Sequence, residues 1–598
     1  MRPYRRISSA LIIGAVLMPI ATAAALLAQS RSAQAPAGSS DDPPPLSSLV
    51  AFARTESDLR GAVNRYVLDK AALERRYEIP FSPERNARLK AFYDGWRKRV
   101  AEADFNGLNP EGKIDFVMLR NRIDYDIEMQ ALADRRWTQM APLLPFFDKL
   151  RQLPEDRNDR KRADPRATAT TLNDLAREIG QLTAKVAADR QPRTDLDRVV
   201  ATRAAAQIDA LRPIVADWRT FYDGYDPVMS WWIGEPYGRF EKALVAYADA
   251  LRTHIVGVRP GVPAPIVGDP VLAEGLKADL AFEMIPYTPD ELLAIGQREF
   301  DATEAQFKVV AREMGFGDDW KAALEHTKNL APPPGEAPWA IFDIARYSED
   351  FIEKMHSVTM APLAREVWRL AMQTPERQLI NPFFTGGELT RVSYPTDTMT
   401  HDDKLMSLRG NTPPFNFATV HHELVPGHHL QQFLSERFNP QRLALQRTPF
   451  WREGWALYWE LQLWDRGFAR TGPEKIGMLF WRLHRAARIV FSLNYHLGRW
   501  TPQQAVDFLV ERVGHERANA EGEVRRTTID APLYQAAYLL GGLQFRALYR
   551  DFVESGKMTA TAFHDAILIG GFMPVELVRA RLAGTPITRD LKTTWRFY

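Results

Sequence analysis

"LNDLAREIGQLTAKVAADR", residues 172–190, places apolar side chains three and four residues apart, with charged side chains between them. This period gives an α-helix one apolar face to bury and one polar face to leave in water. The same pattern fills most windows from about residue 49 to 259 and returns in four windows between residues 452 and 555. The sequence therefore predicts an all-α, mostly helical protein.

Proline and glycine interrupt the helical pattern in "VRPGVPAPIVGDP" (258–270) and "APPPGEAP" (331–338), which we interpret as loops. Thr501 followed by Pro502 has the N-cap and N1 pattern of a helix start. The segment "GGELTRVSYPTDT" (386–398) differs because it combines glycines, β-branched residues and a tyrosine before a proline. That composition predicts a short β edge within the helical fold.

The N-terminus predicts export. Residues 1–35 combine a basic start, an apolar run and the small-residue site "AQA", as in a cleaved signal peptide. We expect a periplasmic protein; the alternative is anchoring to the inner membrane by an uncleaved segment, because the apolar run is close to the length that a bilayer requires. Residues 36–48 predict a disordered Pro/Ser-rich tether. Residues 49–598 are expected to form a single large helical domain, with two helical halves around a cleft.

The composition narrows the possible chemistry. The chain has no cysteine, which excludes disulfides, thiolate metal ligands and a cysteine nucleophile. Any metal must therefore be held by histidine, aspartate or glutamate. The formal net charge of +2 includes four arginines in residues 1–35 without an acidic residue, so residues 36–598 carry −2. We expect no nucleic-acid partner and no stable membrane association after signal cleavage.

The segment "VHHELVPGHHLQQ" (420–432) places four of the chain's 12 histidines around Glu423. A His-Glu pair followed by another histidine begins many zinc hydrolase helices, in which two histidine ligands stand at positions i and i+4. Here position i+4 from His422 is Pro426, and Gly427 follows. Proline lacks an N–H, and its ring would collide with the carbonyl of His422. The helix must therefore bend, bulge or restart.

This break leaves the second histidine ligand open. On a straight helix, His422 and His429 differ in direction by about 20°, whereas His422 and His428 differ by about 120°. A two-residue bulge would instead bring His428 to the place of an i+4 ligand. Spacing alone does not separate the two histidines. The alternative to a metal site is a bent surface helix that is rich in histidine.

A catalytic zinc ion needs three protein ligands and one open position. Glu453 in "FWREGWALYWELQ" is the candidate third ligand, and Glu460, on nearly the same helix face, is placed to orient a ligand. Glu423 suits the role of general base, because it adjoins His422. The candidate donor to the oxyanion is Tyr538. Its alternatives are Tyr534, Arg525, Arg526 and His496.

Three blocks resemble the signature blocks of the bacterial family called domain of unknown function 885. They are "HELVPGHHLQ" (422–431), "EGWALYWE" (453–460) and "PLYQAAYLLGG" (532–542). The resemblance extends from about residue 50 to the C-terminus. Members of this family are similar to gluzincin zinc peptidases, which have two histidine ligands and a distal glutamate. Their mostly helical fold, with a central channel, is like that of angiotensin-converting enzyme and carboxypeptidase Taq.

The resemblance implies roles for individual residues. His422 and His428 match the ligand histidines, Glu423 the base and Glu453 the third ligand. The family pattern keeps histidine at position 428 and varies the next residue, so the resemblance selects His428. It also implies that 386–398 is an edge strand that holds the substrate backbone. The last block departs from many relatives, because "EVRRTTIDAP" lacks their Arg-Tyr pair.

The expected function is that of a zinc-dependent hydrolase with one Zn²⁺ per chain, most consistent with a metallopeptidase that cleaves short peptides. One alternative is a zinc amidase or esterase with a non-peptide substrate. The other is a non-catalytic periplasmic binding protein on the same fold. The sequence predicts neither the oligomeric state nor the identity of the substrate.

Overall fold

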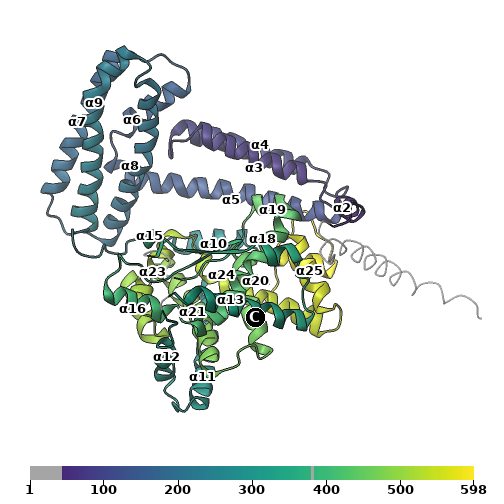
Figure 1. The fold of residues 1–598 in the computed structure, drawn as a ribbon. Coiled ribbons are helices and arrows are strands. Elements are labelled where there is room, and N and C mark those ends of the chain that lie inside the picture. Colours follow the sequence, from purple (N-terminus) through teal and green to yellow (C-terminus); the bar gives the residue numbers. More distant parts are fainter. Residues whose placement is uncertain (1–43, 334, 379–382) are drawn as a thin grey trace, which may run out of the picture.

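The computed structural model describes residues 44–333, 335–378 and 383–598, which fold mostly into helices (Figure 1). Within these residues there are two short strands, β1 (Arg369–Met372) and β2 (Leu389–Val392). The prediction of an all-α fold is therefore confirmed. The predicted loop 258–270 contains no helix, whereas helix α13 begins at Ala337, within the predicted loop 331–338. Thr501 caps helix α22 (Pro502–Phe508) through a capping box with Gln504, as its sequence pattern predicts.

The N-terminal predictions are tested only in part. The expected signal peptide, residues 1–35, and residues 36–43 lie outside the described residues. The tether was predicted to reach residue 48, which is wrong: helix α2 (Leu46–Ala53) begins at Leu46. The helix forms there because Phe52 is buried and packs edge-on against Phe438, with ring centroids 4.8 Å apart. No helix in the described part of the chain is long and apolar enough to cross a membrane.

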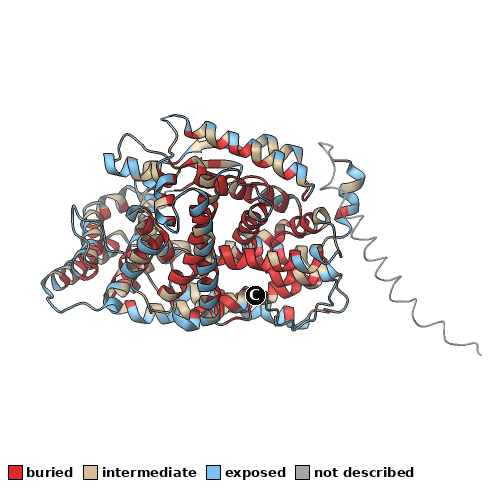
Figure 2. Cartoon of the chain, turned by 90° about the horizontal axis from the view of Figure 1, so that it is seen from below, coloured by how far each residue is buried: buried red, intermediate tan, exposed pale blue. Residues whose placement is uncertain are grey.

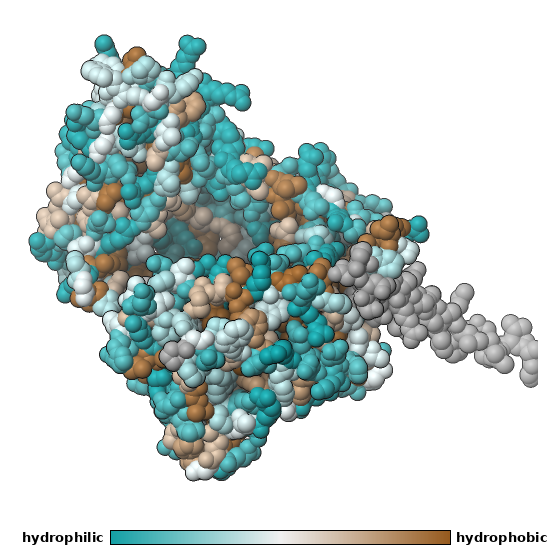
Figure 3. Space-filling model, viewed as in Figure 1, coloured by the Kyte–Doolittle hydropathy of each residue, from teal (hydrophilic) through white to brown (hydrophobic). Residues whose placement is uncertain are grey.

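Seven helices follow α2 and form an arm and a bundle (Figure 1). They are α3 (Arg60–Arg76), α4 (Pro83–Glu102), α5 (Pro110–Met140), α6 (Phe147–Asn158), α7 (Pro165–Ala188), α8 (Asp195–Tyr222) and α9 (Pro227–Ala250). Helices α6–α9 surround a hydrophobic core of their own, in which Leu172, Leu175 and Ile179 of α7 are fully buried. The long helix α5 connects this bundle to the rest of the molecule. Figure 3 shows the surface hollowed between the bundle and the remaining body.

The second, larger hydrophobic core lies in the body and extends into helices α2–α5. Besides α22, the helices of the body are α10 (Leu272–Phe282), α11 (Pro289–Glu313), α12 (Trp320–Lys328), α13 (Ala337–Met355), α14 (Pro362–Val367), α15 (Pro375–Gln378), α16 (His401–Gly410), α17 (Pro413–Glu423), α18 (His428–Arg437), α19 (Pro440–Leu445), α20 (Pro449–Asp465), α21 (Gly472–His496), α23 (Arg517–Ile529), α24 (Tyr534–Tyr549), α25 (Ala560–Gly570) and α26 (Val575–Ala583). Helices α20, α21 and α24 are buried along most of their length. Figure 2 shows such buried helices in red within a partly exposed shell.

The two strands form a small parallel sheet, in which Arg369 is the partner of Leu389. Strand β2 lies within residues 386–398, which were predicted to be extended. Only four residues of that segment belong to the strand. An isolated antiparallel bridge joins Thr385 to Arg391. The backbone N–H of Gly387 donates to the carbonyl of Glu423 over 3.4 Å. The extended segment is thereby attached to the end of α17.

Helices α20 and α24 cross at two glycines. A Cβ atom at Gly541 would lie 2.8 Å from Cα of Gly454 and 2.3 Å from the carbonyl oxygen of Phe450. Only glycine therefore permits this close approach of the two backbones. The crossing sets the position of Glu453, on α20, relative to the tyrosines at the start of α24.

Replacement of Gly541 with alanine is expected to lower the free energy of unfolding by about 1–3 kcal/mol, because the added methyl group overpacks the crossing. Urea unfolding followed by tryptophan fluorescence measures this loss. Gly95→Ala on α4 is the matched control, because a Cβ there meets no atom within 4 Å. Equal stability of Gly541→Ala and the wild type would show that the crossing tolerates a side chain.

Candidate metal centre and its pocket

The histidine-rich segment breaks into two helices. Helix α17 ends at Glu423, and α18 begins at His428 after a turn. A side chain at Gly427 is sterically excluded, because its Cβ would lie 1.8 Å from the carbonyl oxygen of His422. The indole N–H of Trp455 donates to the carbonyl of Pro426 over 2.8 Å, which attaches the turn to α20. The helix thus restarts, one of the three outcomes expected from the sequence.

This restart brings the three predicted ligands together. Oε2 of Glu453 lies 3.0 Å from Nε2 of His428 and 3.6 Å from Nε2 of His422. Nitrogen and oxygen ligands hold Zn²⁺ at about 2.0–2.2 Å in a tetrahedron, so that neighbouring ligand atoms are about 3.3 Å apart. The two measured distances bracket this separation. Two imidazoles and one carboxylate are also the donors that suit zinc, so the residues fit the ion that the resemblance implies.

The far sides of both imidazoles face polar groups. Nδ1 of His422 lies 2.6 Å from Oε1 of Glu460, and Nδ1 of His428 lies 3.3 Å from Oε1 of Gln431. Groups that bind the second ring nitrogen fix the tautomer and the orientation of a metal-ligating histidine. Glu460 therefore lies where the sequence placed a ligand-orienting residue. Gln431 was not predicted.

The cluster favours a positive charge. Burial alone would lower the pKa of His422, but the adjacent carboxylates of Glu453 and Glu460 raise it to about 9. Burial alone would raise the pKa of Glu453, but the neighbouring His428 and His422 lower it well below its usual value. The hydroxyl of Tyr534 donates to Oε1 of the same carboxylate. Glu453 is thus an ionised, oriented oxygen donor.

The other two histidines of the segment are directed elsewhere. Nε2 of His429 lies 2.6 Å from the carbonyl oxygen of Ala364. His421 is fully buried against Phe468, and burial lowers its pKa to about 4. The structure therefore places His428, and not His429, beside Glu453.

Glu423 lies on the other side of the ligand histidines. One donor atom each from His422, Glu423 and His428 lie within 4.8 Å of one another. The Glu423 carboxylate lines a pocket beside Gly386, where a Cβ would stand 2.2 Å from Oε2. The glycine leaves room for the carboxylate next to the extended segment. A general base must reach the substrate and the attacking water, and a carboxylate that lines the pocket meets this requirement.

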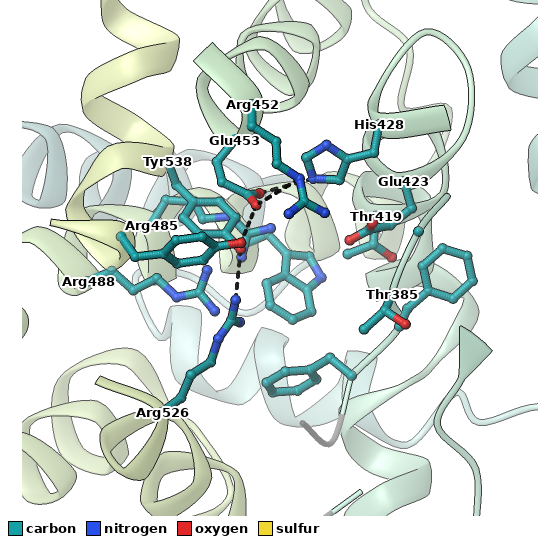
Figure 4. Close-up of a pocket in the computed structure, with 15 residues that line it drawn as sticks. Thr385, Thr419, Glu423, His428, Arg452, Glu453, Arg485, Arg488, Arg526 and Tyr538 are labelled. Carbon is teal, nitrogen blue, oxygen red and sulfur yellow. Dashed lines mark hydrogen bonds and ion pairs between the residues drawn. The ribbon is translucent and has the colours of Figure 1, made fainter. Parts of the chain in front are cut away.

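The carboxylates of Glu423 and Glu453 line one shared pocket. Residues 383–386 and helices α17, α18, α20, α21, α23 and α24 supply its walls. Figure 4 shows Thr385, Thr419, Glu423 and His428 on one side and Arg485, Arg488, Arg526 and Tyr538 on the other. Sequence segments separated by more than 100 residues therefore meet around one cavity.

The candidate oxyanion donors differ in whether they line the pocket and in which groups they already bind. Tyr538 and Arg526 line the pocket, and Nη2 of Arg526 donates to the Tyr538 hydroxyl over 3.2 Å. Burial raises the pKa of Tyr538, which keeps the hydroxyl proton available to donate. Tyr534 also lines the pocket, but its hydroxyl is bound to Glu453. Arg525 instead donates to the Ala264 carbonyl. His496 does not line the pocket.

Three further arginines of the pocket were not predicted: Arg452, Arg485 and Arg488. Arg485 and Arg488 are on α21 and are only 4% and 2% exposed. The sequence shows them as charges on an amphipathic helix, a pattern that usually indicates a solvated face. A signal existed only for Arg452, because it directly precedes the predicted ligand Glu453.

Glu460→Gln is expected to weaken zinc binding by about 10–100-fold, the usual effect of losing a carboxylate that orients a ligand histidine. Competition against a chromophoric chelator measures the dissociation constant. Asp465→Asn serves as the control, because Asp465 is on the same helix but pairs with Arg546 at a partly exposed site. Unchanged zinc affinity in Glu460→Gln would contradict the orienting role.

These features define the class: a mostly helical protein with a buried histidine and glutamate cluster at the wall of a polar pocket. The chain belongs to the family described as "Bacterial protein of unknown function (DUF885)", which matches residues 67–582. The family expected from the three sequence blocks is thereby confirmed. Comparison with curated proteins gives no match.

Two solved structures share the fold. The first is described as "a putative lipoprotein of unknown function from Shewanella oneidensis", with a TM-score of 0.62 and 16% identity. The second is described as "the putative lipoprotein from Colwellia psychrerythraea", with a TM-score of 0.54 and 16% identity. Each alignment covers 87% of this chain and 98% of the other. At this identity, the similarity concerns the fold alone.

Proposed function

We propose that this protein is an exported zinc-dependent hydrolase, a gluzincin-like metallopeptidase that cleaves short peptides. The observation that carries the proposal is the convergence of His422 Nε2 and His428 Nε2 on Oε2 of Glu453, at 3.6 and 3.0 Å. Glu423 adjoins this cluster at the pocket wall. Export is supported by the signal-like N-terminus, and the two structural relatives are described as lipoproteins.

His422, His428 and Glu453 would hold the zinc ion. When bound, zinc makes a water molecule more acidic and polarises a carbonyl group. The carboxylate of Glu423 accepts a proton from the attacking water and then transfers it to the leaving amine. Of the segment 386–398 that was expected to bind the substrate backbone, only Gly386 lines the pocket, and residues 383–385 continue this wall beside Glu423. A peptide backbone would bind along this wall.

Tyr538 supplies the donor to the oxyanion of the substrate carbonyl. Its ring lies nearly parallel to that of His422, with 6.0 Å between the ring centroids. Because Arg526 donates to the Tyr538 oxygen, it polarises the hydroxyl and strengthens it as a donor. The pair thus acts as one group.

The test is a hydrolysis assay of zinc-loaded protein with short peptides, acyl amides and esters. We expect peptide cleavage that a chelator abolishes and added zinc restores. Cleavage of amides or esters without peptide cleavage would favour the alternative hydrolase. Stoichiometric zinc without any hydrolysis would favour the binding protein.

A further inference from the structure

We propose that the four pocket arginines form a subsite for a carboxylate group of the substrate, close to the bond that is cut. The subsite, called here the arginine wall, consists of Arg452, Arg485, Arg488 and Arg526. The inference rests on the proposed hydrolase function and adds the chemical class of its substrate. It predicts peptides with a free α-carboxylate or an acidic side chain beside that bond.

Arg488 carries the strongest evidence. Its Nε and Nη2 donate to the same oxygen of Glu523, over 3.0 and 2.7 Å. Its guanidinium packs over the Tyr538 ring, 4.5 Å from the centroid. Nη1, on the edge turned away from Glu523, is buried without a hydrogen-bond partner among the described residues. An unsatisfied buried charged donor costs free energy that a bound anion would recover.

Arg485 repeats this arrangement one helical turn earlier. Its guanidinium packs over two rings, 4.8 Å from the Trp481 centroid and 4.9 Å from that of Tyr538. Nη2 is 3.4 Å from Oε1 of Glu460, whereas Nε is buried without a partner in the described part of the chain. The two rings and Glu460 fix the orientation of the guanidinium, and its Nε–H remains free to donate to a ligand.

The other two arginines enter from different helices. Arg526 is held by Asp530 and Tyr538, over 2.9 and 3.2 Å. Arg452 comes from α20 and forms an ion pair with Glu453 at 3.8 Å, which is longer than a hydrogen bond. Figure 4 shows its guanidinium entering the pocket between Glu453 and His428. Donors from three helices therefore face one cavity.

The acids near the arginine wall leave some of its donors free. The carboxylates that line the pocket belong to Glu453, which faces the ligand histidines, and to Glu423 on the opposite side. Glu460, Glu523 and Asp530 stand behind the arginines and each occupy only part of a guanidinium. Guanidinium groups bind carboxylates through paired, charge-assisted hydrogen bonds. A substrate carboxylate is the group that these spare donors suit.

The experiment compares three tripeptides: Ala-Ala-Ala, its C-terminal amide, and the amide of Ala-Glu-Ala. With zinc-loaded protein, we expect kcat/KM for Ala-Ala-Ala to exceed that of its amide by about 10–100-fold, the range of a charge-assisted hydrogen bond. A high value for Ala-Glu-Ala amide would place the recognised carboxylate on a side chain. Each result supports the arginine wall and identifies the source of the carboxylate.

Arg488→Gln should reduce the ratio of the acid to the amide rate constant towards one. Because the ratio is measured within one protein, partial misfolding does not imitate this effect. Arg482→Gln is the matched control: Arg482 is on the same helix and partly buried, but pairs with Glu299 away from this pocket. Its ratio should equal that of the wild type.

Equal cleavage of all three peptides would overturn the arginine wall while leaving the hydrolase function intact. If no peptide is cleaved, the hydrolase function fails, and titration calorimetry of zinc-loaded Glu423→Gln with the same peptides decides the inference. Tighter binding of a carboxylate-bearing peptide than of Ala-Ala-Ala amide, lost when Arg488→Gln is added, would support it. Equal binding or no binding of all three would overturn it.

Discussion

Glu423→Gln is expected to abolish peptide hydrolysis while leaving one zinc ion bound per chain. The amide is nearly the same size as the carboxylate but cannot accept the proton of the attacking water. General bases contribute about 10²–10⁴-fold to the rate, so kcat should fall by this factor. The ligand atoms of His422, His428 and Glu453 are unchanged. Steady-state kinetics and metal analysis of the same preparation test both parts.

Glu436→Gln is the matched control, because Glu436 is exposed on α18 and bonds only to Gln432 among the described residues. It should retain wild-type activity. Activity that survives in Glu423→Gln would remove Glu423 from the reaction. Loss of zinc together with activity would instead indicate that Glu423 is a metal ligand, as its place within 4.8 Å of both histidine donors permits.

The second large effect is a loss of zinc that we expect on replacing His428 but not on replacing its neighbour His429. His428→Ala should lose stoichiometric zinc and all hydrolysis, because its Nε2 is one of the three converging donors. The loss of affinity should exceed the roughly 100-fold that removal of an orienting group causes. His429→Ala should retain zinc and activity, since Nε2 of His429 lies against the Ala364 carbonyl. Metal content and kinetics of both variants provide the comparison.

His429→Ala also controls for effects on folding, because His428 and His429 are both buried in the first turn of α18. A general loss of stability would affect both variants, whereas loss of a ligand affects one. Zinc retained in His428→Ala but lost in His429→Ala would reverse the assignment and imply a straighter helix than the structure has.

The helical fold follows from local patterns in the sequence. The apolar face of 172–190 predicts α7 because that face is buried in the bundle core. Strand β1 could not be predicted: its four residues do not alternate, and its parallel partner lies 20 residues further along the chain. The extension of α2 to Leu46 was missed because its support, Phe438, is also distant in sequence.

In the candidate site, too, some residues could be predicted from local sequence patterns and others could not. His422, Glu423, His428 and Glu453 lie in two recognisable blocks, so their residue types and spacing predict the cluster. The arginine wall depends on contacts that no local pattern shows: Arg488 is buried because Glu523, on another helix, accepts its hydrogen bonds. Charges on an amphipathic helix look alike in the sequence until such long-range partners are known.

The most direct test is an anomalous difference map at the zinc edge, from crystals of protein loaded with one equivalent of zinc. We expect a single strong peak, about 2.0–2.2 Å from Nε2 of His422, Nε2 of His428 and a carboxylate oxygen of Glu453. A peak that contacts His429 with His428 turned away, or a pocket without any peak, would contradict the proposed zinc site.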